Sequence, residues 1–337
     1  MKKALIWGAG NKLYEHWLAI KMSFDIVGII DSDTRKQGTH FGDFIIGDKS
    51  LLDSLNYDYI LIVPNEHKFE IISELSEMKD YQNKILPYFG YKNNMEYSSF
   101  LTKRGVQIIG TKGKHPFKCY LKNSSDFEIF EDIFLKDVYS FSGWGKYVVF
   151  DIGMNIGLAA IYFASQEIVE HVYAFEPFFP TYNQALENIK INDALVKEKI
   201  TTFQVALSNY NGEYAFKYMK DHPGGMSILG NSAESYNGED TCRASIANAA
   251  ETLEPLLDKH TSNKIVLKID TEGSEYDILY ILEDHGLLNR INIFIIETHG
   301  LHVREIQEIM QRNRFTFFQQ YSTGVPELGM MYAVRDR

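Results

Sequence analysis

The chain of 337 residues is longer than a typical single domain, so about two domains are expected. Hydrophobic residues make up 45% of it, aromatic residues 14% and charged residues 23%, a composition that excludes long-range disorder. The 45 acidic residues outnumber the 34 basic ones, giving a formal net charge of -11. Such a charge repels the phosphates of nucleic acids and disfavours a dedicated DNA- or RNA-binding protein.

The two cysteines, Cys119 and Cys242, are far apart and show neither the spacing of a disulfide framework nor that of a structural zinc site. The apolar run at the start of the chain ends at Gly8, which is too short for a signal peptide. No window approaches the roughly 18 apolar residues of a membrane-spanning helix. We therefore expect a cytoplasmic protein without membrane insertion.

The first part of the chain alternates short apolar runs with amphipathic stretches, which is typical of parallel strands joined by helices. The pattern predicts a strand over residues 3–8, a helix over 12–22, strands over 25–31 and 57–63, and a helix over 67–78. This is a small Rossmann-like α/β sheet of the nucleotide-binding type. The periodicity is lost over residues 91–114, so we place the boundary near residue 100 and expect domains over residues 1–98 and 99–337.

A second alternating series fills the rest of the chain. It predicts helices over residues 126–138, 156–165, 181–191 and 274–288, and strands over 146–151, 171–176, 200–207, 264–270 and 292–299. A hairpin at the end of the chain would add an antiparallel edge, so the second domain is predicted to be a doubly wound α/β sheet. Residues 218–248 are rich in Gly, Ser, Asn and Asp and predict a long loop, either a lid or disordered.

The stretch DIGMNIG, residues 151–157, lies where a predicted strand meets a predicted helix. Gly153 and Gly157 allow a tight turn, and the helix start presents free amides to a ligand. Asp151 places a carboxylate at the same point, where it would repel a pyrophosphate by several kcal/mol at ~4 Å. A ligand with positive charge therefore fits this turn better.

The next predicted strand ends in Glu176, which is followed by Pro177. An acid at the tip of the second strand can accept hydrogen bonds from the hydroxyls of a ribose. A ribose joined to a cationic group describes S-adenosylmethionine.

Eight stretches carry a resemblance to a known family. They are DIGMNIG, VYAFEP, NQALENIKIN, QVALSNYNGEYAF, SIL near Ser227, ETLEPLL, LKIDTEGSEYDIL and IIETH, in this order over about residues 145–300. In them the chain resembles the FkbM family of S-adenosylmethionine-dependent methyltransferases. The resemblance implies a class I methyltransferase sheet of seven strands with the last one antiparallel. It also implies a cofactor site made of Asp151, Gly153, Asn155, Gly157, Glu176 and Pro177, with Ala206 and Leu207 beside the adenine.

The chain departs from the family pattern at two positions. Met154 stands where Ala is commoner, and Glu254 stands where Asp is commoner. Neither change removes a cofactor-binding group, but the second leaves the role of that acid open.

Methyl transfer to a sugar hydroxyl requires an acceptor for the hydroxyl proton, which is a base or a metal ion. Acidic residues follow two predicted neighbouring strands, with Asp270 and Glu272 after one and Glu297 after the other. Because neighbouring strands lie ~4.8 Å apart, Asp270 and Glu297 could share a proton or, with Glu272, bind a divalent metal ion. The sequence leaves both alternatives open.

His299 is the titratable group of this region whose ordinary pKa lies near neutrality, so it is the candidate base, with His222 as the reserve. We group His299 with Asp270 and Glu272 as the catalytic candidates. Acids at a helix start also cap free amides, and this alternative stays open for Glu275 above all.

The first domain presents WGAG, residues 7–10, and then Asp31, 23 residues after Gly8. This is an incomplete dinucleotide fingerprint, because Leu13 occupies the third glycine position. The stretch DIVGIIDSDTRKQG, followed by IIGDKSLL, is similar to the amino-terminal nucleotide-sugar-binding domain of PglD-like sugar acetyltransferases. That resemblance implies that Gly8, Gly10 and Asp31 face a nucleotide. The alternative is a domain for stability or dimerisation, which leaves a homodimer open.

The resemblance to the FkbM family implies an S-adenosylmethionine-dependent O-methyltransferase. Its substrate would be a sugar hydroxyl of a nucleotide-activated sugar or glycan precursor for a bacterial surface or capsular polysaccharide. Two alternatives remain open: a nicotinamide-dependent nucleotide-sugar oxidoreductase, which the incomplete glycine pattern disfavours, and a non-catalytic nucleotide-sugar-binding protein.

Overall fold

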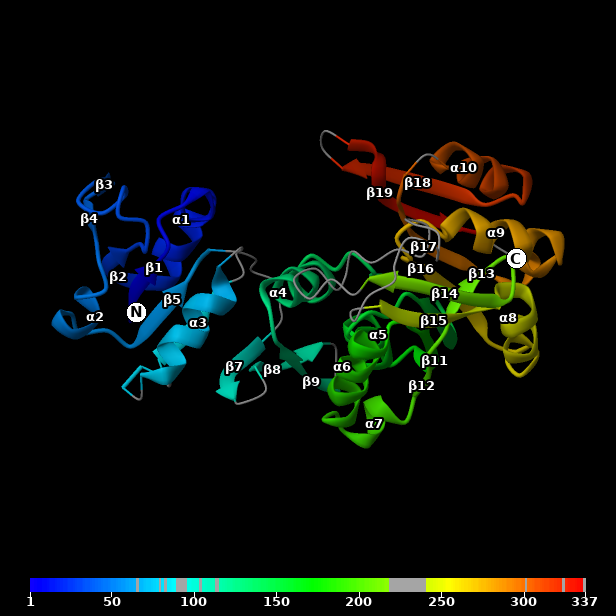
Figure 1. Ribbon diagram of the computed structural model, residues 1–337, viewed down its shortest axis with the longest axis horizontal. Coiled ribbons are helices and arrows are strands. Elements are labelled where there is room, and N and C mark those ends of the chain that lie inside the picture. Colours follow the sequence, from blue (N-terminus) through cyan, green and yellow to red (C-terminus); the bar gives the residue numbers. More distant parts are fainter. Residues whose placement is uncertain are drawn as a thin grey trace. The chain divides into compact units, whose positions relative to one another are not determined.

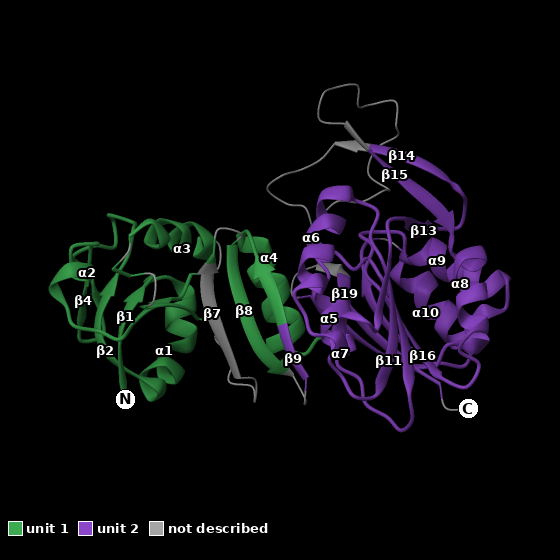
Figure 2. Ribbon diagram, turned by 90° about the horizontal axis from the view of Figure 1, so that it is seen from below, with its two compact units in different colours: residues 1–111, 118–138 green, residues 112–117, 139–337 purple. Residues whose placement is uncertain are grey.

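A computed structural model describes residues 1–64, 67–78, 80–81, 84–88, 96–102, 105–112, 115–217, 241–300, 302–322 and 325–335. The chain divides into two compact units (Figure 2). The first comprises Met1–Thr111 and Lys118–Val138, and the second comprises Lys112–Phe117 and Tyr139–Arg337. The boundary expected near residue 98 falls inside the first unit, and a domain division at that residue stays a prediction.

The first unit contains a six-stranded sheet in the order β3-β4-β2-β1-β5-β6 (Figure 1). Its strands are β1 (Lys2–Trp7), β2 (Phe24–Ile30), β3 (His40–Phe41), β4 (Phe44–Gly47), β5 (Tyr59–Ile62) and β6 (Ile85–Pro87). The sheet is parallel except for the pairing of β3 with β4. Its helices are α1 (Asn11–Ser23), α2 (Leu51–Ser54) and α3 (Lys68–Glu77). The predicted Rossmann-like α/β sheet is thus present.

The central strand of this sheet is β1, because its residues 4–7 are all buried, as expected for a parallel strand covered on both faces. The strands β2 and β5 lie on opposite sides of β1. The chain therefore changes direction across the sheet at β1, and a crevice opens at the carboxyl ends of these strands.

A smaller sheet follows in the order β7-β8-β9, in which β7 (Glu96–Thr102) and β8 (Gly105–Lys112) are antiparallel and β9 is His115–Leu121. The next helix, α4 (Ser124–Phe130), continues as a π-helical turn, η2 (Glu131–Leu135). The side chain of Asn123 caps α4 by accepting a hydrogen bond of 2.9 Å from the backbone N–H of Asp126. With this cap the helix begins at Ser124, two residues before its predicted start.

The second unit is built on a seven-stranded sheet in the order β12-β11-β10-β16-β17-β19-β18. Its strands are β10 (Tyr147–Ile152), β11 (Val169–Phe175), β12 (Ile200–Phe203), β16 (Lys264–Ile269), β17 (Ile293–Thr298), β18 (Thr316–Ser322) and β19 (Val325–Val334). The first five are parallel to one another, and β19 runs antiparallel to both of its neighbours. This is the doubly wound class I methyltransferase-like sheet that the sequence predicts.

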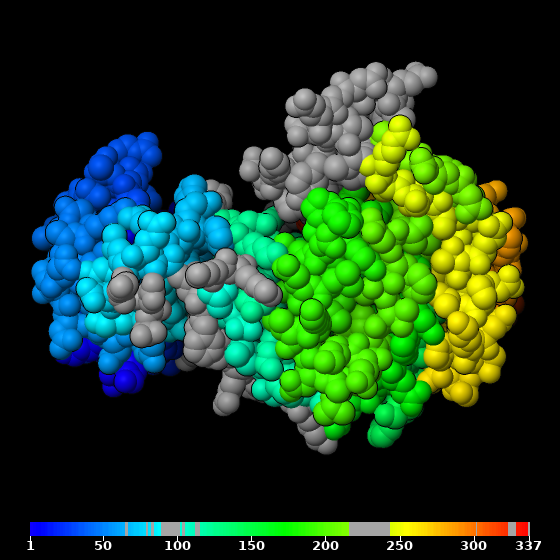
Figure 3. All heavy atoms as spheres, turned by 60° about the horizontal axis from the view of Figure 1, so that its bottom comes forward, coloured from blue at the N-terminus to red at the C-terminus, as the bar shows by residue number. Residues whose placement is uncertain are grey.

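Helices cover both faces of this sheet, with α5–α7 on one face and α8–α10 on the other (Figure 2). They are α5 (Leu158–Ala164), α6 (Phe179–Lys190), α7 (Ala194–Lys197), α8 (Ala249–Asp258), α9 (Glu275–Asp284) and α10 (Val303–Arg312), with a short 3-10 helix, η5 (Leu287–Arg290). Figure 3 shows the second unit from the side where α6 and α7 (green) and α8 (yellow) form its surface. Within the described residues, no helix has the length and hydropathy needed to cross a membrane.

The single strand predicted over residues 200–207 is wrong. β12 ends at Phe203, and residues 206–208 form a separate strand, β13, which pairs with β15 (Thr241–Asn248) in a small sheet ordered β13-β15-β14. β14 is Gly212–Lys217. The apolar run continues through the change of sheet, so hydrophobicity alone does not reveal it. The predicted loop over 218–248 ends early, because its last eight residues form β15. Residues 218–240, with His222 and Ser227, lie outside the described residues.

Candidate active site

The turn after β10 is the first part of the site, and its two predicted glycines are both required by the fold. Gly153 has a φ of +80°, and a Cβ there would lie 1.7 Å from the carbonyl oxygen of Asp270. Gly157 has a φ of +83°, and a Cβ there would lie 3.1 Å from the Cβ of Ala185. The absence of side chains therefore allows the turn to touch the end of β16 and α6 to pack closely on it.

Glu176 lies beside this turn at the end of β11, where the sequence predicts it. Its Oε2 accepts a hydrogen bond of 3.0 Å from the backbone N–H of Asn155, and its Oε1 accepts one of 2.9 Å from that of Phe178. The side chain is buried, and this burial raises its pKa to about 7, although the two amides act in the opposite direction. Each carboxylate oxygen retains a lone pair for a further donor, such as a ribose hydroxyl.

Asn155 offers a second polar group at the turn. Its backbone lies in the left-handed region, with a φ of +51°. Its side-chain Oδ1 is buried and, within the described chain, has no hydrogen-bond partner. A buried acceptor without a partner is costly, so this oxygen fits a donor group on a bound ligand. Glu176 and Asn155 together therefore suit the cofactor that the sequence predicts.

Asp151 is fully buried beneath the turn and is paired with a residue that the sequence analysis missed. Lys268 Nζ lies 3.1 Å from Asp151 Oδ1 and 3.4 Å from Asp270 Oδ2, and it donates a hydrogen bond of 2.5 Å to the carbonyl oxygen of Gly153. Burial alone would lower the pKa of Lys268, but the two carboxylates outweigh it and raise that pKa. Burial raises the pKa of Asp151, and Lys268 opposes this effect.

Lys268 thus compensates the negative charge of Asp151, which was expected to attract a cationic ligand. Direct contact between Asp151 and the cofactor stays a prediction. The sequence does contain an indication of this pair, since Lys268 interrupts the apolar run KIVLKID, and a lysine in a buried strand needs an acidic partner.

Asp270 joins the cofactor turn to a second cluster of polar side chains. Its Oδ2 accepts a hydrogen bond of 2.9 Å from the hydroxyl of Tyr139. Burial, followed by the charge of Asp270, raises the pKa of Tyr139 well above its usual value, so the phenol remains a donor. Lys268 Nζ lies 5.2 Å from the centroid of the same ring. The carboxylate of Asp270 is therefore held between a phenol and an ammonium group.

His299 lies among three glutamates at the end of β17. Its Nδ1 is 3.1 Å from Glu275 Oε1, while its Nε2 is 3.6 Å from Glu272 Oε2 and 3.9 Å from Glu297 Oε1. Burial lowers the pKa of the imidazole, but the bond to Glu275 and the nearby carboxylates outweigh this and raise it to about 9. These surroundings favour a protonated imidazole at neutral pH, so the predicted role of His299 as a base has no support from them.

Glu275 binds groups of the loop before α9, and capping of the amides of the helix itself stays a prediction. Its Oε1 accepts hydrogen bonds from the backbone N–H and the hydroxyl of Thr271 and from the backbone N–H of Gly273, each 3.0 Å long. The fully buried carboxylate therefore fixes the loop before α9 as well as the Nδ1 side of His299. Because Nδ1 is engaged, Nε2 is the nitrogen available to a ligand.

Three residues of this cluster could hold a metal ion. Asp270, Glu297 and His299 each offer one ligand atom, and these atoms lie within 4.8 Å of one another. Burial and the charge of Asp270 raise the pKa of Glu297 to about 8. A bound cation would therefore offset the repulsion between the carboxylates of Asp270 and Glu297. The sequence suggests Glu272 as the third ligand of this site. In the structure His299 completes the group of three instead, and the side chain of Glu272 lies beside His299 Nε2. Two carboxylates and one imidazole suit a divalent transition metal ion or Mg²⁺.

The other predicted cofactor residues lie on the elements next to the turn. Ala206 and Leu207 are buried in β13, and Pro177 separates Glu176 from α6. Contact between these residues and the cofactor stays a prediction. In the first unit, Gly8, Gly10 and Asp31 line one cavity, and their contact with a nucleotide stays a prediction.

Comparison with known families agrees with this geometry. The model of the methyltransferase FkbM domain matches residues 151–321, which is just over half of the chain and includes the turn, Glu176 and the cluster around His299. The chain belongs to the FkbM methyltransferase family. Residues 151–321 thus form an S-adenosylmethionine-dependent methyltransferase domain, and the cofactor predicted from the sequence is that of this family. A second family model, described as C2185-like, N-terminal, matches residues 1–86 of this chain. The resemblance to PglD-like sugar acetyltransferases stays a prediction.

Individual relatives of this methyltransferase are distant. The AMB antimetabolite synthetase AmbE of Pseudomonas aeruginosa is 25% identical over 206 residues, which cover 51% of this chain and 9% of the synthetase. The crystal structure of methyltransferase FkbM from Methylobacillus flagellatus KT is similar over 98% of this chain and 90% of its own, with 12% identity and a TM-score of 0.37. M. capricolum TrmK in complex with S-adenosyl-homocysteine is similar over 59% of this chain and 66% of its own, with 13% identity and a TM-score of 0.34.

Proposed function

We propose that this methyltransferase transfers the methyl group of S-adenosylmethionine to a hydroxyl oxygen of a sugar. The substrate would be a nucleotide-activated sugar or a glycan precursor of a bacterial surface polysaccharide such as a capsule. The observation that carries the choice of oxygen is the position of Asp270. Its carbonyl oxygen touches the cofactor turn at Gly153, and its carboxylate belongs to the cluster with Glu297 and His299. A hydroxyl bound beside the turn would therefore meet groups able to take its proton.

The cofactor would be held at the end of β10 by the residues of the turn and by Glu176. When bound, S-adenosylmethionine supplies a methyl group on a positively charged sulfur. Glu176 would accept hydrogen bonds from its ribose, and Asn155 Oδ1 would accept one from a donor of the ligand. The ion pair of Lys268 with Asp151 holds the turn after β10 in place, because Lys268 also binds the carbonyl of Gly153.

The acceptor hydroxyl is a weak acid, so its proton has to be removed as the new bond forms. The ligand atoms of Asp270, Glu297 and His299 lie within 4.8 Å of one another, and we assign the proton to this cluster rather than to His299 alone. A divalent cation held by the same three residues would lower the pKa of the hydroxyl. Tyr139 and Lys268 would then orient the carboxylate of Asp270 through their contacts with its Oδ2.

The test is an incubation of the full chain with methyl-labelled S-adenosylmethionine and a panel of nucleotide-linked heptoses, hexoses and deoxysugars. Mass spectrometry of the products should find the label on a sugar oxygen of at least one of them. Glu297→Gln should reduce turnover by about 10²-fold or more while cofactor affinity stays unchanged. The matched control is Glu305→Gln on the exposed surface of α10, which should behave as the wild type. Transfer of the label to nitrogen or carbon instead of oxygen would contradict the proposal.

A further inference from the structure

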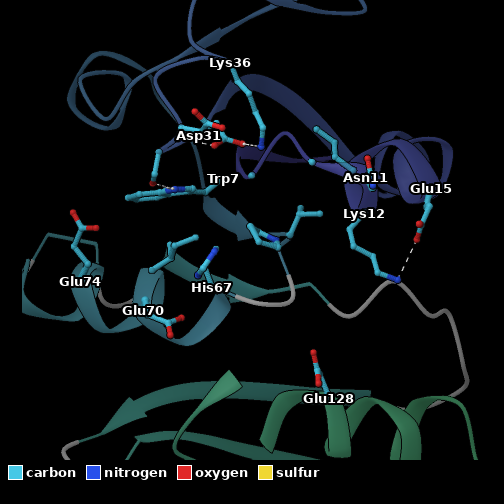
Figure 4. Close-up of a pocket in the computed structure, with 18 residues that line it drawn as sticks. Trp7, Asn11, Lys12, Glu15, Asp31, Lys36, His67, Glu70, Glu74 and Glu128 are labelled. Carbon is cyan, nitrogen blue, oxygen red and sulfur yellow. Dashed lines mark hydrogen bonds and ion pairs between the residues drawn. The ribbon is translucent and has the colours of Figure 1, made fainter. Parts of the chain in front are cut away.

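The first unit contains a cavity of about 880 Å³ that the methyltransferase site does not use (Figure 4). It opens at the carboxyl ends of β1, β2 and β5 and is bordered by the first turns of α1 and α3. This is the point where the strand order of the sheet reverses, and open α/β sheets bind their ligands there. The volume lies within the range of small-molecule sites.

Gly10, at the edge of this cavity, is a glycine that the protein itself does not require. Its φ of -102° and ψ of -169° are ordinary extended values, and a Cβ there would meet nothing closer than Lys36 Nζ at 3.9 Å. Gly8 is different, since its φ is +114° and a Cβ would lie 2.4 Å from Pro64 Cδ. The space that a side chain at position 10 would fill is therefore part of the cavity, and it allows a ligand to approach the backbone.

This end of the cavity suits an anion. The helix α1 has 13 residues, no side chain caps its amino terminus, and no acidic residue lies in its first turn. The amide of Leu13 donates to the carbonyl oxygen of Gly10, whereas the amides of Asn11 and Lys12 precede any intrahelical acceptor and can bind a ligand. Lys36 Nζ reaches the same point and is held 3.0 Å from Asp31 Oδ2. Lys12, in the first turn of α1, adds a second ammonium group to the lining, 3.1 Å from Glu15.

Asp31 holds both the glycine turn and Lys36 in place. The residue is 8% exposed, and its Oδ2 accepts a hydrogen bond of 2.7 Å from the backbone N–H of Ala9 and one of 3.0 Å from Lys36 Nζ. Its Oδ1 accepts one of 2.8 Å from the backbone N–H of Asp33. Asp31 thus fixes the glycine turn and orients Lys36, the anion-binding group.

The opposite wall of the cavity is acidic. Figure 4 shows Glu70 and Glu128 on the side away from Lys36, with Glu74 on the same helix as Glu70. The described residues of the whole lining include two lysines and six acids, so a ligand with several negative charges would be repelled by most of the cavity. Carboxylates accept hydrogen bonds from hydroxyl and amino groups. The fitting ligand is anionic at one end and rich in donors at the other.

We propose that this cavity binds a small phosphorylated metabolite. Its phosphate group lies at Gly10 between the start of α1 and Lys36, and its hydroxyl or amino groups face the glutamates of α3. Nucleoside 5′-monophosphates and sugar phosphates share this chemistry. The site is separate from the methyl-transfer chemistry, so its occupancy can be measured without turnover.

The experiment measures binding to the full chain by titration calorimetry. The probes are the four common nucleoside 5′-monophosphates, hexose 1-phosphates, NAD and inorganic phosphate, each tested alone. We expect one class of organic phosphate to bind at least about tenfold more tightly than inorganic phosphate. Gly10→Val should weaken that binding by about tenfold or more, Gly10→Ala should have a smaller effect, and Lys36→Gln should weaken it by about tenfold.

The matched control is Lys2→Gln, which removes an exposed ion pair with Asp58 at the other end of β1 and should leave binding unchanged. A far-UV circular dichroism spectrum and a melting curve like those of the wild type show that each variant is folded. Unchanged affinity for S-adenosylmethionine separates this test from that of the methyltransferase site. Three results would overturn the proposal. They are no binding of any organic phosphate at millimolar concentration, equal binding by the wild type and Gly10→Val, and a preference for NAD or inorganic phosphate.

Discussion

Lys268 and Asp151 face each other across the neighbouring strands β16 and β10, with Nζ 3.1 Å from Oδ1 and both side chains at most 1% exposed. Because Lys268 also binds the carbonyl of Gly153 and the carboxylate of Asp270, one ammonium group connects the cofactor turn to the proposed proton-accepting cluster. A shift of this lysine would disturb both parts of the site.

Lys268→Met should therefore lower the free energy of unfolding by roughly 3–5 kcal/mol, because it leaves Asp151 buried without a compensating charge. Urea denaturation at neutral pH measures the loss. The double variant Lys268→Met/Asp151→Asn should recover much of it, since the buried charge is then gone. Lys264→Met, at the exposed start of the same strand, is the control and should stay within about 0.5 kcal/mol of the wild type. Equal losses in Lys268→Met and the control would show that the pair does not stabilise the fold.

Glu176 predicts a pH dependence of cofactor binding. Burial raises its pKa from the usual 4.5 to about 7, so the folded protein favours the protonated acid. Its contribution to stability is therefore fully present below about pH 4.5 and is lost as the pH rises through 7. Ribose hydroxyls instead donate stronger hydrogen bonds to the ionised carboxylate than to the protonated acid, so nucleoside affinity should increase as the pH rises through 7.

The probe for this prediction is 5′-methylthioadenosine, which carries the ribose without the titrating amino acid of the cofactor. Calorimetry between pH 6 and pH 8, a range of about one unit on either side of the pKa, should show the increase. Glu176→Gln should bind with an affinity that does not change over this range. A wild-type affinity that is equally flat would remove Glu176 from the ribose site.

A divalent cation should stabilise the second unit through Asp270, Glu297 and His299. Binding to the folded chain at about 100 times the dissociation constant contributes about 2.7 kcal/mol, which raises the melting temperature by several degrees. Calorimetric melting with Mg²⁺ or Mn²⁺, compared with melting in a chelator, measures the shift. Glu297→Gln removes one ligand and should reduce the shift without lowering the melting temperature in the chelator. An identical shift in the variant would place the cation elsewhere.

The sequence predicts the elements of this site better than their register. The apolar run of β10, the glycines of the turn and the acid at the end of β11 all follow from local pattern, and the structure places them together. The pairing of Asp151 with Lys268 depends on which residues of β10 and β16 are opposite each other, and apolar runs of parallel strands do not specify this.

Loop conformation is the second limit. Glu272 and His299 both follow strands, and the sequence suggests Glu272 as a metal ligand and His299 as a base. The loop places Glu272 in the left-handed region, with a φ of +55°, beside His299 rather than in the group of three ligands. Such a choice depends on the bonds from Glu275 to residues 271 and 273, which only the folded loop brings together.

The cofactor turn itself gives the sharpest test of packing. Gly153 and Gly286 both have a positive φ, +80° and +67°, so an alanine at either position is strained by about 1–2 kcal/mol. A Cβ at position 286 would have nothing within 4 Å, whereas one at position 153 would lie 1.7 Å from the carbonyl oxygen of Asp270. Gly286→Ala therefore measures the backbone strain alone, and Gly153→Ala adds the collision with β16. We expect denaturation to show a loss more than about 2 kcal/mol greater for Gly153→Ala, accompanied by weaker binding of S-adenosylmethionine. Similar losses for the two variants would mean that the turn can move away from Asp270, and the close contact between cofactor turn and proton-accepting cluster would not be a fixed feature of the protein.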